Sequence, residues 1–121
     1  MYILGINAFH GDASAVLLRD GRLVAAVEEE RFRRVKHWAG FPTEAIRGVL
    51  RMGGITGADV AHVAIGRDPK ANLLKKGMFA LSKRPDFRLL FDRAKNAHKV
   101  RDIREPLADA LGVAPEKAPT V

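Results

Sequence analysis

The stretch FHGDASAVLLRDGRLVAAVEEERFRRVKH, residues 9–37, decides how the first part of the chain folds. Two apolar runs, 13–19 and 22–28, flank the dipeptide Asp20-Gly21. This pattern is typical of two antiparallel strands joined by a tight turn. Such a hairpin needs only alternating side chains and a good turn. The polar residues before the first run, and the glutamates and basic residues after the second, are therefore candidates for a functional site.

Further strands and a helix are predicted around this hairpin. Residues 2–7 and 60–65 are short apolar runs that favour strands. Between them, the sequence TEAIRGVLRMGG has apolar residues at helical spacing, which predicts a helix capped by Thr43 and ended by Gly53-Gly54.

The second half of the chain reads as mainly helical. From Pro69 onward the apolar residues recur at three-and-four spacing, so 67–113 is interpreted as a basic helical segment. Pro106 suits the first turn of a last short helix that ends at Gly112. Residues 119–121 resemble the start of a further strand.

This order of elements predicts an α/β fold. Three strands in a meander followed by helix, strand and helix build the actin-like ATPase, or ribonuclease-H-like, lobe, and we expect 1–121 to be an incomplete lobe of this kind. In that architecture the loop 7–14 faces the ligand cleft. Gly11 permits a positive φ there, and Ser14 presents little bulk to a phosphate or acyl group.

Composition narrows the class of protein. The segment 67–105 carries 12 Lys or Arg and 5 Asp or Glu, which accounts for the whole net charge of +7. Cysteine is absent, so disulfides and thiolate chemistry are excluded. No apolar run is long enough to span a bilayer and the start lacks the features of a signal peptide, so we expect a cytoplasmic protein without membrane partners.

Three motifs together carry a resemblance to a known family. FHGDASAVLLRDG, then VAAVEEERFRRVKH, then FPTEAI resemble the N-terminal end of the carbamoyltransferases that include the nodulation and antibiotic O-carbamoyltransferases. The resemblance covers about 3–65, and 67–113 lies where that family is variable.

The resemblance implies a two-step reaction that uses ATP and carbamoyl phosphate as substrates. A downstream domain would join them to carbamoyladenylate, and the actin-like domain would pass the carbamoyl group to a hydroxyl of a small acceptor alcohol in natural-product or glycan biosynthesis. Iron or another divalent metal is expected only in a downstream region, with no metal site in 1–121. The implied partner is the rest of the same polypeptide or a companion subunit, and 1–121 alone is expected to be inactive.

Two residues are catalytic candidates within this signature. An imidazole is an efficient base near neutral pH, so His10 is the candidate base for the acceptor hydroxyl, and the alternative is a loop residue bonded to backbone. Lys36 is the first choice among the cations to hold a phosphate or polarise the carbamoyl oxygen. The alternative for the basic cluster is salt bridging to the glutamates at 28–30.

The remaining candidates are expected to bind substrate. Asp12 would orient His10 or the acceptor, or it is only a turn former. Ser14 is interpreted as a close-packing residue or a hydrogen-bond donor rather than a nucleophile. The other predicted substrate-binding residues are Gly11, Arg34 and His37.

Three other aromatic or histidine side chains are expected to have structural roles. Trp38 and Phe41 are expected to pack on the following helix, and His62, in an apolar strand, is expected to be structural.

Two other functions remain open from the sequence. The loop 7–14 suits the nucleotide phosphates of a kinase or ATPase lobe of the same fold. The basic segment 67–105 suits a non-catalytic nucleic-acid-binding module, although it contains no RNA-binding fingerprint.

Overall fold

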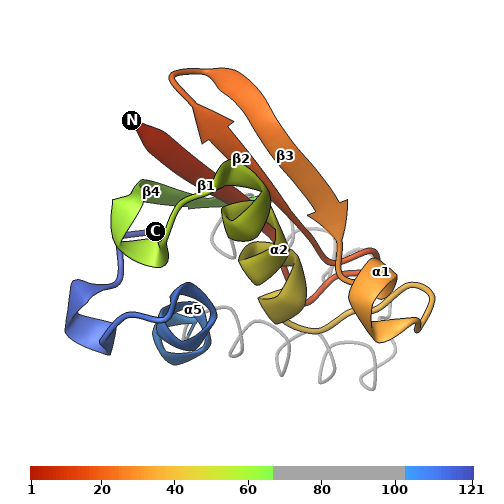
Figure 1. Cartoon of the computed structure of the whole chain (residues 1–121). Coiled ribbons are helices and arrows are strands. Elements are labelled where there is room, and N and C mark those ends of the chain that lie inside the picture. The colour runs from red at the N-terminus through yellow and green to blue at the C-terminus, as the bar shows by residue number, and fades with distance from the viewer. Residues whose placement is uncertain (67–102) are drawn as a thin grey trace, which may run out of the picture.

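The computed structural model describes residues 1–66 and 103–121, and these residues form an α/β structure around one mixed sheet (Figure 1). The strands are β1 (Tyr2–Asn7), β2 (Ser14–Arg19), β3 (Arg22–Glu28) and β4 (Val60–Ile65), in the order β3-β2-β1-β4. The first three are antiparallel, and β4 pairs in parallel with β1. The predicted strands and the α/β class are thereby confirmed.

The hairpin turn has the predicted chemistry. Asp20 and Gly21 both take positive φ, 51° and 77°, as a two-residue turn that follows the strand twist requires. The second strand begins one residue later than predicted. The Ala13 N–H donates to the Trp38 carbonyl oxygen at 2.9 Å instead of to a neighbouring strand.

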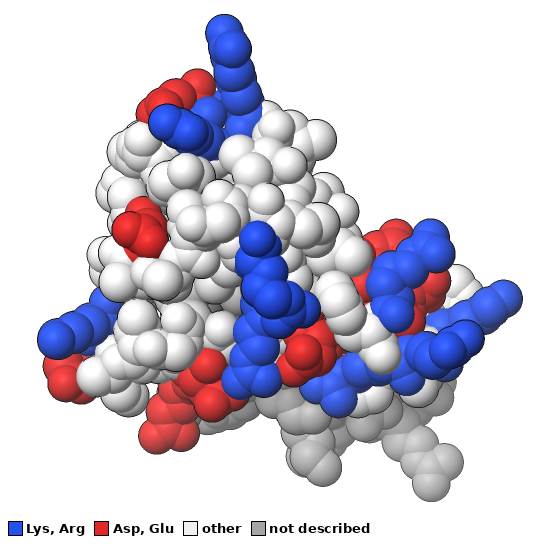
Figure 2. All heavy atoms as spheres, viewed as in Figure 1, with Lys and Arg blue, Asp and Glu red and all other residues white. Residues whose placement is uncertain are grey.

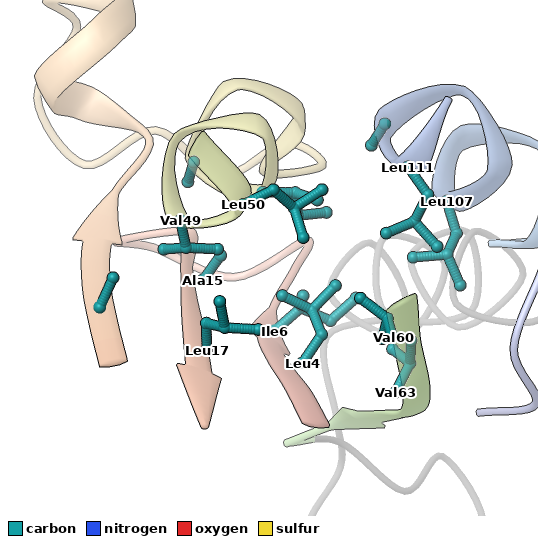
Figure 3. Close-up of a cluster of buried hydrophobic side chains, with 14 residues drawn as sticks. Leu4, Ile6, Ala15, Leu17, Val49, Leu50, Val60, Val63, Leu107 and Leu111 are labelled. Carbon is teal, nitrogen blue, oxygen red and sulfur yellow. The ribbon is translucent and has the colours of Figure 1, made fainter. Parts of the chain in front are cut away.

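Two helices cover the same face of the sheet. They are α2 (Thr43–Gly53) and α5 (Arg104–Leu111), and they contact each other (Figure 1). Alternation along the strands sends one set of side chains toward these helices. Figure 3 shows side chains of the sheet and of both helices meeting in this layer, among them Leu4, Leu17, Val49 and Leu107, all fully buried.

The predicted helices within the described residues form, with one correction. The helix 43–53 ends where Gly54 turns left-handed at φ 63°, as expected. Thr43 was the wrong cap, because it is the first helical residue and the N-cap position is Pro42, with no side-chain cap from either. Pro106 lies in the first turn of α5, and Gly112 ends that helix at φ 67°.

The other elements are short. They are α1 (Glu30–Arg33), η1 (Gly57–Asp59) and η2 (Pro115–Lys117). The expected strand at 119–121 was wrong, because these residues follow η2 without pairing to the sheet. The helices predicted between 69 and 102 lie outside the described residues. Within 1–66 and 103–121, no helix has the length and apolarity that crossing a membrane requires.

Candidate functional site

A buried carboxylate joins the end of the hairpin to helix α2. Glu29 follows β3 and is 0% exposed. Its Oε2 accepts the Ala45 N–H at 2.7 Å, and its Oε1 accepts the Glu44 N–H at 3.3 Å and Arg33 Nε at 2.7 Å. It therefore supplies the side-chain cap that Thr43 does not, and its charge favours the N-terminus of a helix.

Arg33 extends this connection to the aromatic residue of the next loop. Its guanidinium pairs with Glu29 and lies 4.6 Å from the centre of the Trp38 ring. Trp38 thus packs under Arg33 rather than simply on the following helix. Phe41 does pack against the core that includes α2, and its ring lies 6.1 Å from that of Phe9.

Two loops lie together at the α1 end of the sheet: 8–13, between β1 and β2, and 34–41, between α1 and α2. The Phe9 N–H donates to the Gly40 carbonyl at 3.1 Å, and Ala13 makes its bond to Trp38 in the same way. From the end of β1, Asn7 Nδ2 donates to the Asp12 carbonyl at 3.1 Å. Figure 2 shows charged side chains of both signs gathered around this end of the molecule.

Backbone strain is concentrated in these two loops. Among the described residues, positive φ at non-glycine positions occurs at Asp20 in the hairpin turn and at four loop residues: Phe9 (56°), Asp12 (63°), Arg34 (58°) and His37 (54°). Left-handed backbone costs a non-glycine residue about 1–2 kcal/mol, and such strain tends to cluster at functional sites.

The positive φ in the first loop lies at a different residue from the one expected. Gly11 was expected to provide the positive φ, but it does not adopt one, and Asp12 does so instead. A Cβ added at Gly11 would meet nothing within 4 Å, so space is open beside it.

The two loops bring Asp12 and His37 into contact. Asp12 Oδ1 lies 2.8 Å from His37 Nδ1, and both side chains are exposed, by 57% and 78%. The hydrogen bond and the negative charge of Asp12 raise the pKa of His37, and the more distant Glu30 and Glu28 act in the same direction. Asp12 was expected to orient His10 or the acceptor; within the molecule its partner is His37.

His10 has a different partner. Its Nδ1 lies 3.2 Å from the Gly11 carbonyl oxygen, and its side chain is exposed. The backbone bond expected in the alternative interpretation is therefore present, and the role of His10 as a base stays a prediction.

The two predicted cations, Arg34 and Lys36, both have exposed side chains. Arg34 ends α1, where its N–H donates to the Glu30 carbonyl at 2.8 Å, and its side chain is exposed. Lys36 is exposed, and its ammonium has no ion-pair partner in the part of the chain that the structure describes. The expected pairing of the basic cluster with the glutamates holds for Arg33.

A groove lies on the sheet face opposite the helices, beside the base of the first loop. Its volume is about 740 Å³. Small residues line its floor, including Gly5, Ala26 and Ala64, and Ser14 and Asn7 lie at its polar end. The charged residues of its lining are Glu28 and Arg31. A Cβ on Gly5 would come within 2.7 Å of Val16 Cγ1, so the close pairing of β1 and β2 here needs glycine.

Sequence reasoning did not name three residues of this region as site residues: Asn7, Glu29 and Arg31. Asn7 carried a weak signal, because a polar residue ends an apolar strand next to the loop. Arg31 and Glu29 stood inside the charged run, where alternation alone separates a buried carboxylate from its solvated neighbours.

One further expectation about a histidine was wrong. His62 was expected to be structural, but its side chain is exposed on β4. The strand buries Val60 and Val63 instead, because an irregularity in its pairing with β1 falls between Tyr2 and Ile3.

No three His, Asp or Glu side chains among 1–66 and 103–121 are placed to hold a metal ion together. The metal expected in a downstream region lies outside this chain and stays a prediction.

Comparison with known proteins identifies the family to which this α/β domain and its two-loop site belong. The family model described as "Carbamoyltransferase N-terminus" matches residues 2–84. The chain therefore belongs to the carbamoyltransferase family and corresponds to its N-terminal region, as the three motifs predicted.

The match to each curated relative covers only part of that relative's length. It is 46% identical over 68 residues to the uncharacterized protein sll1178 of Synechocystis, which covers 56% of this chain and 11% of the relative. It is 43% identical over 58 residues to the nodulation protein NolNO of Sinorhizobium fredii, covering 48% and 8%. An uncharacterized 19.2 kDa protein in the syrM 5′ region of Rhizobium etli is 41% identical over 58 residues, covering 48% and 34%. The chain thus spans 34% or less of the length of these relatives.

Proposed function

We propose that this chain is the N-terminal part of the actin-like domain of an O-carbamoyltransferase. The complete enzyme would make carbamoyladenylate from carbamoyl phosphate and ATP, and it would transfer the carbamoyl group to a hydroxyl of a small-molecule acceptor. The observation that carries this proposal is the family match over 2–84. The similarity to a nodulation protein supports an acceptor in glycan or natural-product biosynthesis.

The strand arrangement supports the actin-like part of the proposal. A meander of three antiparallel strands is followed by a helix and by a strand parallel to β1, as the first lobe of that fold requires. Fold alone does not define chemistry, so the transferase assignment rests on the family and on the loops.

The loop groups suit acyl transfer. Attack on a carbamoyl carbon needs a base for the acceptor proton and donors for the oxygen on which negative charge develops. His10 and His37 supply imidazoles, and Arg31 and Lys36 supply cations near the same end of the sheet. Ser14, Gly11 and Arg34 belong to the same loops and would contact the substrate together with Asp12.

The same proposal defines what lies elsewhere. The adenylating chemistry and any divalent metal would belong to the rest of the polypeptide or to a companion subunit, in the cytoplasm. The 121-residue chain by itself would then transfer no carbamoyl group.

The test uses the complete enzyme that contains this chain, supplied with ATP, carbamoyl phosphate and a panel of sugar and aminocyclitol alcohols. Pyrophosphate release and carbamoylated acceptor are measured in the same reaction, the latter by mass spectrometry. The expected result is a carbamoylated alcohol, with Asp12→Ala impaired in its formation and the exposed His62→Gln unchanged. ATP hydrolysis that proceeds equally without carbamoyl phosphate would instead indicate a kinase or ATPase lobe.

A further inference from the structure

The contact between Asp12 and His37 defines which nitrogen of His37 is available for chemistry. Nδ1 lies 2.8 Å from the carboxylate, so the neutral ring carries its proton there. Nε2 is then the acceptor nitrogen, and no partner for it exists among the described residues. An aspartate that holds Nδ1–H while Nε2 takes a proton is the arrangement that serves general-base catalysis by histidine.

The two imidazoles of the site differ in this respect. The Nδ1 of His10 has only the neutral carbonyl of Gly11 as its partner, at 3.2 Å. A base becomes a cation when it takes a proton, and a carboxylate stabilises that cation far better than a carbonyl does. His37 is therefore the better-equipped base of the pair.

The surrounding backbone holds the pair in place. Both residues adopt left-handed backbone, Asp12 at 63° and His37 at 54°. Asn7 bonds the carbonyl of Asp12, and the Glu30 carboxylate accepts the N–H of His37 at 3.3 Å. A contact between two loops that is maintained at strained positions indicates a requirement for those positions beyond chain reversal.

We propose that His37, positioned by Asp12, is the general base of the transfer step. The inference rests on the proposed carbamoyl transfer and deepens it. In the step, Nε2 of His37 takes the proton of the acceptor hydroxyl, and the oxygen forms a bond to the carbamoyl carbon. The bond from that carbon to the adenylate phosphate oxygen breaks, and the adenylate leaves with the electron pair as its phosphate anion. The proton on His37 is then released to solvent.

The rate of transfer should follow the ionisation of His37. The charged groups that face it are Asp12 from the first loop, Glu28 from the end of β3 and Glu30 from α1. All three favour the imidazolium, so the transfer rate should rise with pH through a midpoint above 6.5. Replacing Asp12 by Asn should move that midpoint to lower pH.

The decisive variant exploits the backbone at position 37. Glycine adopts a φ of 54° without strain, so His37→Gly removes the imidazole without burdening the loop. The exposed position also leaves room for free imidazole to replace the side chain. The matched variants are His10→Gly, for the rival imidazole, and His62→Gly, for an exposed histidine outside the loops.

The experiment measures single-turnover transfer and adenylate formation in the complete enzyme. For His37→Gly we expect transfer to fall by about 10²- to 10⁴-fold with adenylate formation intact, and added imidazole to restore part of it. The transfer rate of His10→Gly should fall less than that of His37→Gly, and the transfer rate of His62→Gly should equal that of the parent. Transfer by His37→Gly at the parental rate, or a loss that only His10→Gly shows, would overturn the assignment. If the parent enzyme makes carbamoyladenylate but carbamoylates none of the acceptor alcohols, this result would contradict the proposed function itself.

Discussion

Glu29 and Ala45, sixteen positions apart, are joined by a 2.7 Å hydrogen bond from the Ala45 N–H to the Glu29 carboxylate. The end of one strand thereby caps the first turn of the helix that covers the sheet. The same carboxylate binds Arg33, which stacks on Trp38. One buried residue thus positions both α2 and the loop that carries His37.

Replacing this carboxylate should destabilise the domain. Glu29→Gln keeps the shape but removes the charge, and one amide hydrogen would face the backbone N–H groups that the carboxylate now accepts. We expect a loss of about 2–3 kcal/mol in the free energy of unfolding, since hydrogen bonds to charged groups contribute about that much. Urea unfolding of the 121-residue chain measures it. Glu28→Gln, at the exposed neighbouring position, is the control and should change stability by less than about 0.5 kcal/mol. Equal effects of the two variants would show that the cap is unimportant.

The ionisation of His37 gives a second prediction. Asp12 raises its pKa above the ordinary value of 6.5, so the folded state binds this proton more tightly than the unfolded chain. The stabilisation is present in full below 6.5 and disappears as pH rises through the higher folded pKa. NMR titration of the imidazole signals should give a pKa for His37 above 6.5 in the parent. In Asp12→Asn the pKa of His37 should lie closer to 6.5. A pKa of His37 that does not respond to Asp12→Asn would mean that the contact is not formed in solution.

Much of the fold could be predicted because local rules act on it. The turn at Asp20-Gly21, the helical spacing of 43–53 and the glycine at 112 each depend on residues close in sequence. The cap of α2 could not be predicted in this way. It comes from Glu29, which only the folded chain brings next to Ala45. Thr43 was predicted as the cap because local sequence rules consider only residues next to the start of the helix.

The site was predictable to a lesser degree. The motifs placed His10, Asp12 and His37 in two separate runs, but spacing does not reveal which of them meet. Their pairing depends on left-handed backbone at Asp12 and His37. A glycine at either position would have predicted this conformation, but an aspartate or a histidine does not. His62 shows the converse limit, because an irregularity in strand pairing changed which residues of β4 face the core.

Gly57, the first residue of the short helix η1, should tolerate no side chain where η1 contacts α5. A Cβ on Gly57 would overlap the backbone carbonyl of Leu111, which cannot move without shifting the helix. Gly57→Ala should therefore cost at least about 1–3 kcal/mol in the free energy of unfolding. Thermal and urea unfolding provide the measurement. Gly11→Ala, where nothing lies within 4 Å, is the matched control and should be close to neutral for stability. A parental midpoint for Gly57→Ala would contradict the packing of α5 described above.

Asn7 should control the pairing of Asp12 with His37 from a distance. Its amide donates to the carbonyls of Asp12, at 3.1 Å, and Gly11, at 3.4 Å, so it holds the loop that presents the Asp12 carboxylate. In Asn7→Ala the loop loses both bonds, and Asp12 should spend less time in the strained backbone that reaches His37. We expect the pKa of His37 to fall toward 6.5, as in Asp12→Asn, although the amide of Asn7 bonds to backbone carbonyls and does not itself raise that pKa. NMR titration detects this change, and Ser14→Ala, on the paired position of β2, supplies a control that leaves the loop bonds intact. If His37 titrates identically in Asn7→Ala and in the parent, the loop is held by its backbone bonds to Trp38 and Gly40, and Asn7 serves only the groove.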